Sequence, residues 1–185
     1  TIFKQYIETN TDEVENAEYW LALCKWKLGK PQPALDVLQS MLEKSLDSKF
    51  ISSIHLSIAE IYLDTDNAPM ALEHLILAAE TNNDRNERGQ IYYRIAELAY
   101  DAGKLEQALT ANAEVVKNTT SKKRKEAANL QIVRIHRMLG NWDKVKSLIK
   151  TMLLDNIYTS IHGGLELELV KLYQMDKQID EAITR

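Results

Sequence analysis

The chain has 185 residues, 45% of them hydrophobic and 27% charged, with a formal net charge of -4 at pH 7. This length and apolar content are enough to bury an extensive core, and three prolines and six glycines leave little sequence for long loops. The slightly acidic balance argues against general nucleic-acid binding, which needs a basic face, and no apolar run is long enough to cross a bilayer. A folded helical protein remains as the expected class.

Helical hairpins recur along the chain with a period of 37 residues. A small residue opens the second helix of each hairpin: Ala34, Ala71, Ala108, Val145 and Ala182. Five residues earlier stands a helix stop, mostly a residue that tolerates a left-handed conformation: Gly29, Asp66, Gly103, Gly140 and Lys177. Eight residues before each stop stands the large apolar residue of the first helix: Leu21, Ile58, Ile95, Ile132 and Leu169. Because neither helix can bury its apolar face alone, the hairpins are expected to stack.

In chain order, the pattern predicts the end of a preceding repeat and then five repeats, the last one incomplete: 1–10, then 12–46, 49–83, 84–119, 121–155 and 156–185. Pro31 suits the first turn of a second helix. Asp66 to Pro69 predict a turn and cap, and Asp84 to Glu87 have the spacing of a capping box. Thr119 to Ser121 mark the start of the fourth repeat. Half-repeats at both ends indicate a fragment of a longer array.

A small residue follows each large apolar residue: Ala22, Ala59, Ala96, Val133 and Val170. This large–small pair, the turn glycine and the small residue that opens the second helix resemble the tetratricopeptide repeat over essentially the whole chain. The resemblance implies an all-α, right-handed superhelical solenoid that binds a protein or peptide partner. It implies no enzymatic activity and no cofactor. The period is longer than the family's usual one, and the proline that often follows the second helix is missing, which we interpret as an extra helical turn in each repeat. The motif is specific for a fold rather than for one function.

In this family the first helices line a concave groove, so the resemblance implies which residues face a partner. The candidate groove residues are Tyr19, Trp26, Lys27, Glu60, Asp64, Tyr93, Glu97, Tyr100, Asp101, Arg134, Arg137 and Lys171. Repeats two and three would present carboxylates around Tyr93 and Tyr100, and repeats four and five would present cations. A partner segment of opposite polarity would fit, anchored on the aromatic side chains. The alternative is that these are solvated charges on amphipathic helices.

Other site types are not expected. The family's clamp for a free C-terminal carboxylate uses lysine and asparagine, and the corresponding positions here are mostly acidic. No catalytic or metal-ligand spacing connects the histidines, which we interpret as surface or helix-packing residues: His55, His74, His136 and His162. Cys24 is expected on the buried face of its helix. Gly163 and Gly164 would allow close helix approach or loosen the start of a helix.

The basic run Lys122 to Lys125 lies at the start of a predicted first helix. Four positive charges at a helix N-terminus oppose the helix dipole, so stability does not explain their position. We interpret the run as a solvated segment. The alternative is a patch that binds nucleic acid, an acidic protein or lipid head groups.

Three short segments are similar to bacterial cell-envelope tetratricopeptide proteins, which include the Tol-Pal coordinating protein and outer-membrane assembly and secretion lipoproteins: Phe3–Ile7, Ala17–Leu21 and Asp47–Phe50. This resemblance implies a periplasmic location within a multiprotein assembly. One alternative is a cytoplasmic, peptide-sensing regulatory domain that controls an effector outside this chain. Another is a structural spacer or self-association module.

Overall fold

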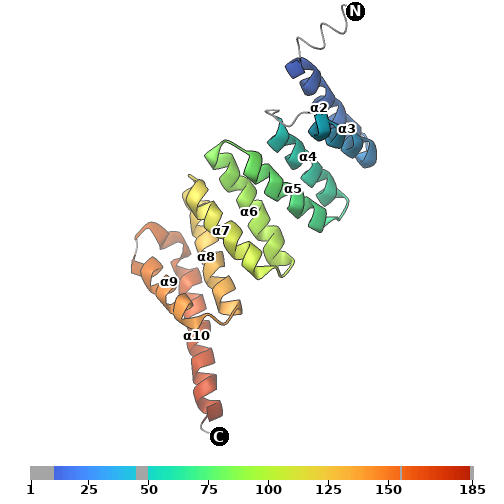
Figure 1. The fold of residues 1–185 in the computed structure, drawn as a ribbon. Coiled ribbons are helices and arrows are strands. Elements are labelled where there is room, and N and C mark those ends of the chain that lie inside the picture. The colour runs from blue at the N-terminus through green and yellow to red at the C-terminus, as the bar shows by residue number, and fades with distance from the viewer. Residues whose placement is uncertain (1–10, 45–49, 155, 184–185) are drawn as a thin grey trace, which may run out of the picture. The chain divides into compact units, whose positions relative to one another are not determined.

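The computed structural model describes residues 11–44, 50–154 and 156–183, and every regular element in these ranges is a helix (Figure 1). The prediction of an all-α chain is confirmed. The chain divides into two compact units, residues 1–83 and 84–185, and each is described by itself. Within the described ranges no helix combines the length and the apolar composition needed to cross a membrane.

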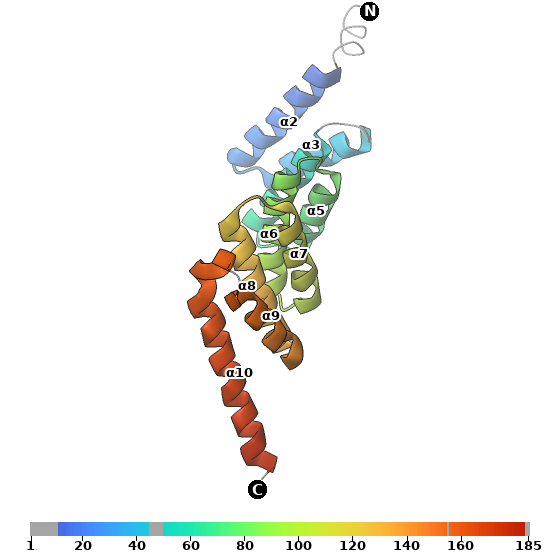
Figure 2. The same ribbon diagram turned by 90° about the vertical axis from the view of Figure 1, so that its left-hand side faces the viewer.

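Two hairpins form the described part of the first unit: α2 (Thr11–Lys27) with α3 (Pro31–Lys44), and α4 (Ile51–Asp64) with α5 (Ala68–Thr81). Helices α2 and α3 of the first hairpin can be followed in Figure 2. Helix α3 also packs against α4. The core that joins the hairpins consists of buried apolar side chains at helical spacing: Ala22, Ala34, Leu35, Leu38, Met41, Ile54, Ile58 and Ile61.

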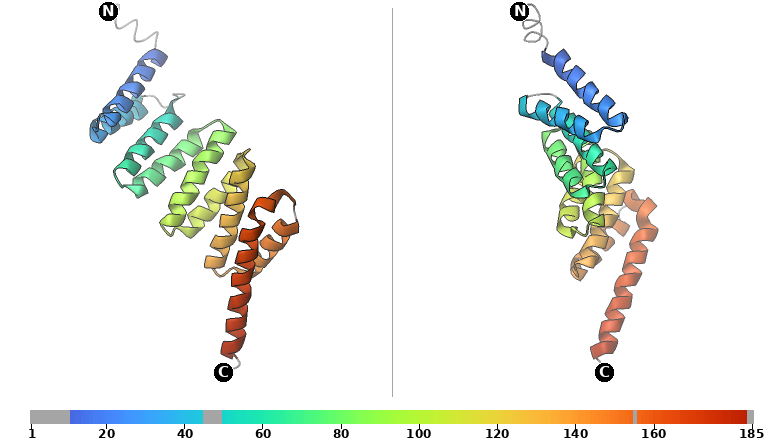
Figure 3. Two further views of the ribbon diagram at one scale, coloured as in Figure 1. Left: turned by 180° about the vertical axis from the view of Figure 1, so that it is seen from behind. Right: turned by 90° about the vertical axis from the view of Figure 1, so that its right-hand side faces the viewer.

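The second unit continues the hairpin pattern with α6 (Arg85–Asp101), α7 (Leu105–Asn118), α8 (Lys122–Met138) and α9 (Trp142–Leu154), followed by the short helix η1 (Asn156–Ile161) and α10 (His162–Ile183). Helix α7 packs against both α6 and α8, and α10 packs against α8 and α9 (Figure 3). One buried cluster holds α8, α9 and α10 together: Val133, Val145, Ile149, Met152, Leu165 and Leu172.

The four hairpin turns share one backbone conformation and one hydrogen-bond pattern. A residue with positive φ ends each first helix: Gly29, Asp66, Gly103 and Gly140. The next residue donates its backbone N–H to a carbonyl five residues back, as Lys30 does to Lys25 over 3.0 Å and Lys104 to Ala99 over 2.8 Å. This is the bonding of a Schellman motif, which satisfies carbonyls at the helix end. The predicted helix stops at these four residues are confirmed.

The predicted stop at Lys177 is wrong, because α10 continues without a break through Ile183. A lysine has a Cβ atom, and the left-handed conformation of a helix stop therefore costs it about 1–2 kcal/mol. Glycine accepts that conformation without this cost, and Asp accepts it more readily than most residues. The second helix expected around Ala182 is thus part of one long helix. The predicted remnant of a preceding repeat, residues 1–10, lies outside the described residues.

Cys24 is exposed, contrary to the prediction that it is buried. Leu21 on the same face of α2 is also 52% exposed, whereas its counterpart Ile58 is 0% exposed. Ile58 lies on the face of α4 that packs against α3, a helix of the preceding hairpin, and α3 covers it. No hairpin precedes α2 in the described residues, so the equivalent face of α2 has no covering helix.

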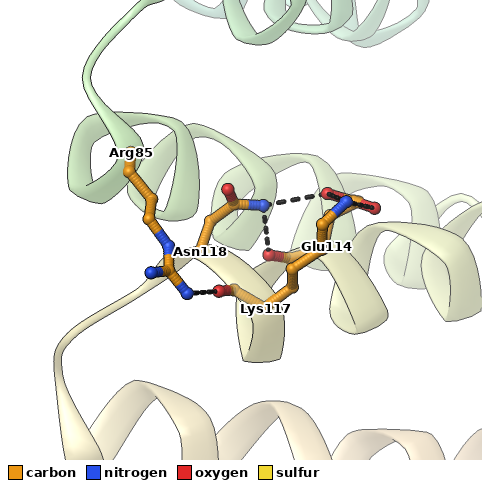
Figure 4. Close-up of polar contacts among 4 residues, drawn as sticks. All are labelled: Arg85, Glu114, Lys117 and Asn118. Atoms are coloured by element: carbon orange, nitrogen blue, oxygen red, sulfur yellow. Dashed lines mark hydrogen bonds and ion pairs between the residues drawn. The ribbon is translucent and has the colours of Figure 1, made fainter.

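One hydrogen bond in Figure 4 joins the start of α6 to the end of α7, and the other contacts drawn there lie within the last turn of α7. The Arg85 guanidinium donates to the carbonyl of Lys117. Asn118 Nδ2 donates to the carbonyl of Glu114 and to its Oε2, each over 2.8 Å. Helix α6 approaches so closely that a Cβ added at Gly89 would lie 2.7 Å from the backbone nitrogen of Thr119. These contacts fix where the side chains of α6 lie within the second unit.

Helices α5, α6 and α8 begin with side-chain caps, as the sequence predicts for the first two. Asn67 accepts a hydrogen bond from the backbone N–H of Met70 at the start of α5. Asp84 does the same for Glu87 over 2.7 Å at the start of α6, and Ser121 for Arg124 at the start of α8. Each cap satisfies an otherwise unpaired N–H of a first turn.

Candidate interaction surface

The candidate groove residues come from alternate helices, as predicted. Helices α2 and α4 contribute Tyr19, Trp26, Lys27, Glu60 and Asp64 in the first unit. In the second unit α6, α8 and α10 contribute Tyr93, Glu97, Tyr100, Asp101, Arg134, Arg137 and Lys171. Within each unit the structure brings some of these side chains into direct contact.

In the first unit, Trp26 is the centre of a small cluster. Its indole Nε1 donates a hydrogen bond to Asp64 Oδ2 over 2.9 Å, which joins α2 to α4. The ammonium group of Lys27 lies 3.7 Å from the centre of the Trp26 ring, a cation–π contact. Tyr19 also reaches α4, where its hydroxyl lies 2.9 Å from Ser57 Oγ. The rings of Tyr19 and Trp26 are therefore held in place while remaining partly accessible.

In the second unit, Tyr93 and Tyr100 are half-buried on α6. Burial raises the pKa of Tyr93, and the negative charge and hydrogen bond of Glu97 raise it further, against an opposing effect of Arg124. Tyr100 donates its hydroxyl to the sulfur of Met138 on α8 over 3.5 Å. Asp101 is exposed at the end of α6. The two tyrosines are thus fixed by different neighbours, one on their own helix and one on the next first helix.

The three predicted cations of the second unit surround one carboxylate that is not among the predicted site residues. Glu168 on α10 is 0% exposed. It accepts hydrogen bonds from Arg137 Nε over 2.7 Å and Lys171 Nζ over 2.9 Å, and Arg134 Nε lies 3.5 Å away. We call these four side chains the Glu168 cluster. The basic end expected from the sequence therefore carries its own internal counter-ion.

The charge state of Glu168 follows from these contacts. Burial alone raises the pKa of its carboxyl group, but the hydrogen bonds and charges of Lys171 and Arg137 outweigh burial and lower the pKa below its ordinary value. Glu168 is therefore ionised at neutral pH, and the cluster carries three positive charges and one negative charge. The burial of Glu168 could have been predicted from its position. It follows Leu165 by three residues and precedes Leu172 by four, a spacing that places all three on one helix face, and both leucines are buried.

Two histidines also meet across a hairpin. His55 on α4 and His74 on α5 lie with their Nδ1 atoms 3.0 Å apart, and His74 lies 5.7 Å from the ring of Tyr62. One imidazole donates and the other accepts, so at least one ring is neutral. Both histidines are helix-packing residues. Among the described residues, no three His, Cys, Asp or Glu side chains gather as a metal site would require.

The basic run occupies the first turn of α8, as predicted. Lys122 and Lys123 are exposed, and Lys122 Nζ lies 3.8 Å from Glu126 Oε1. Glu126 is buried and also accepts a hydrogen bond from Ser160. Gly164 confirms the predicted close approach of helices, because a Cβ there would lie 2.9 Å from a methyl group of Leu130.

Comparisons with known proteins agree with this geometry. Residues 16–45 match the model of the tetratricopeptide repeat family. Repeats of kinesin light chain type from Podosopora anserina, described as TPR-like, superpose with a TM-score of 0.52 over 91% of this chain and 90% of that chain, at 16% identity. The fold is of the tetratricopeptide-like type. Tetratricopeptide-like folds generally serve as non-enzymatic protein-interaction scaffolds.

Further similarities extend beyond this one protein. BtubC (BKLC) from P. vanneervenii superposes on the tetratricopeptide-like chain with a TM-score of 0.54 at 14% identity, covering 82% of this chain and 66% of that chain. Residues 67–155 match a second family model, 26S proteasome subunit RPN7. No curated protein matches the sequence. At these identities the likeness to solved structures is one of fold.

Proposed function

We propose that this chain is a non-enzymatic scaffold that binds a segment of another protein on the face that the first helices form within each of its two units. The observation that carries the proposal is the set of three partly accessible aromatic rings held by neighbouring side chains: Trp26 by Asp64, Tyr93 by Glu97 and Tyr100 by Met138. Aromatic side chains that are already ordered lose little conformational entropy when a partner covers them, which is typical of binding hot spots.

We further propose that the chain works within a multiprotein assembly. The match of residues 67–155 to a 26S proteasome subunit supports a subunit-like role, since the matched protein is part of a larger complex. The cell-envelope location rests on the resemblance of three short segments, and none of the similar proteins named above is described as an envelope protein. Recovery of the native protein in the cytoplasmic rather than the periplasmic fraction would favour the alternative of a cytoplasmic regulatory domain.

The test of the proposed face is affinity capture of partners from the native source, followed by mass spectrometry. The wild-type chain is compared with a Tyr93→Ala, Tyr100→Ala variant and with a Trp26→Ala variant. We expect the aromatic variants to lose specific partners, because truncating a hot-spot residue costs about 2 kcal/mol or more of binding free energy.

The matched control is Tyr173→Ala, which removes an exposed tyrosine of α10 in the same unit. Circular dichroism must show that all variants stay folded. If the Tyr93 and Tyr100 variant captures the same proteins as the wild type, the binding surface lies elsewhere and the proposal fails.

A further inference from the structure

The Glu168 cluster contains more positive than negative charge around a single buried point. Two guanidinium groups and one ammonium group lie within 3.5 Å of the Glu168 carboxylate. One carboxylate neutralises one cation, so two positive charges remain close together without a counter-ion in the cluster. Like charges at such separations repel, and the repulsion is stronger near a protein interior than in water. An additional anion would relieve this repulsion.

The geometry leaves donors available for that anion. Both arginines face Glu168 through Nε, and within the described residues their terminal amino groups make no other hydrogen bond or ion pair. A guanidinium group has five N–H donors, so each arginine keeps a pair of terminal amino groups that can bind an oxyanion. The side chains of Arg134 and Lys171 are 43% and 40% exposed. Buried Glu168 orients the cations, and solvent reaches their outer sides.

Exposed apolar side chains lie beside these cations. Met138 follows Arg134 by four residues on α8, and Leu167 precedes Lys171 by four residues on α10; each apolar residue is 51% exposed. Residues four apart lie on the same side of a helix. Each helix therefore presents a cation and an apolar side chain together, which a free inorganic anion would not use.

We infer that the Glu168 cluster binds the carboxylate side chains of an acidic amphipathic segment of a partner protein, whose apolar residues cover Met138 and Leu167. The inference rests on the proposed function, since it names the chemistry of a partner for the same face. Arg134 and Lys171 contact the partner, and Glu168 is a positioning residue that holds Arg137 and Lys171 in place.

The test uses the full chain and a fluorescein-labelled peptide in which glutamates and leucines follow a helical pattern, with an amidated C-terminus. Fluorescence anisotropy measures its affinity for the wild type and for an Arg134→Gln, Lys171→Gln variant. This variant keeps Arg137 paired with Glu168, and circular dichroism must show that it stays folded. We expect its affinity to fall at least about tenfold, because hydrogen bonds between charged groups are lost.

The matched control is Lys123→Gln with Lys150→Gln, which removes two exposed lysines of the same unit and leaves Glu168 untouched. We expect less than about a twofold change in this control, since exposed charges outside the site contribute little. Equal losses in both double variants, or no binding of the peptide by the wild type, would overturn the inference. So would equal binding of a peptide with glutamine in place of glutamate.

Two further comparisons separate the possible outcomes. If inorganic phosphate displaces the labelled peptide at a concentration lower than that of the peptide's carboxylate groups, the Glu168 cluster binds phosphate. The inference that it binds an acidic protein segment is then overturned. If native partners are lost with the tyrosine variant while the Arg134 and Lys171 variant binds the peptide like the wild type, the proposed function stands and this inference fails.

Discussion

At the scale of single residues, the largest departures from a simple apolar core are titratable groups placed at helix contacts. Glu168, His55 and Glu126 are buried, and each meets a polar partner on another helix. A buried charge or imidazole without such a partner is costly. These side chains therefore make the helix contacts specific, and they also make stability depend on pH.

The histidine pair gives the clearest pH effect. Burial, helped by the neighbouring His74, lowers the pKa of His55 from its ordinary 6.5 to about 4. Burial also lowers the pKa of His74, opposed by Glu73. Because the folded pKa lies below the unfolded one, the pair's contribution to stability is present above pH 6.5 and is lost as the pH falls toward 4. We expect a loss of about 1–2 kcal/mol between pH 7 and pH 5.

Urea unfolding of the wild type and of a His55→Gln variant at pH 7 and pH 5 measures this effect. The variant should lose less stability over that interval, since glutamine does not titrate. His136→Gln is the comparison, because burial also lowers the pKa of this histidine, which lies in the second unit outside the pair, so its contribution to acid sensitivity is measured separately. An identical pH dependence in wild type and His55→Gln would show that the pair does not govern acid sensitivity.

At the scale of helices, local signals in the sequence predicted most of what the structure shows. The caps at Asn67, Asp84 and Ser121 and the turns at Gly29 and Gly103 depend on a few adjacent residues. Such features can be identified from sequence because their physics is local. The exposure of Cys24 could not, because it depends on whether a neighbouring hairpin covers α2. The continuous α10 does have a local signal, a lysine at the stop position, which the repeat period overrode in the prediction.

In the candidate surface, too, the positions of residues along a helix could be predicted from the sequence, whereas their contacts with other helices could not. The helical period placed Tyr93, Tyr100 and Trp26 on first helices, but the partners of Tyr100 and Trp26 lie on other helices. Glu168 was missed because its interpretation required knowing that α8 lies against α10. No short-range pattern relates Glu168 to Arg134 and Arg137, which are about a full repeat away in the chain.

The approach of α6 to the end of α7 leads to a prediction on two glycines. At Gly89 an added Cβ would lie 2.7 Å from Thr119 N and 2.9 Å from Thr119 Cα, and backbone atoms cannot move aside cheaply. Gly89→Ala should therefore destabilise the protein by about 1–3 kcal/mol, although alanine favours a helix. Urea midpoints measure the change.

Gly163→Ala is the matched control, because nothing lies within 4 Å of a Cβ at that position in α10. There the higher helix propensity of alanine should leave stability unchanged or raise it by up to about 1 kcal/mol. A Gly89→Ala protein as stable as Gly163→Ala would show that α6 and α7 can separate without cost.

At the scale of the whole molecule, the helices of each unit contact near neighbours along the chain. Such repeat proteins behave as rows of units coupled mainly to the next one, so damage remains local. Hydrogen exchange of the Gly89→Ala variant should speed up in α6, α7 and the start of α8, while α2 and α3 keep wild-type protection. Uniformly faster exchange would show that the chain unfolds as one cooperative block.

The exposed position of Cys24 has a chemical consequence for where the protein can work. It is the one cysteine among these 185 residues, so it has no disulfide partner among them. In an oxidising compartment such as the periplasm, a surface thiol of this kind joins a second chain or a small thiol compound through a disulfide. In a reducing compartment it stays free. The redox state of this single sulfur in the native source therefore reports which compartment the first hairpin occupies.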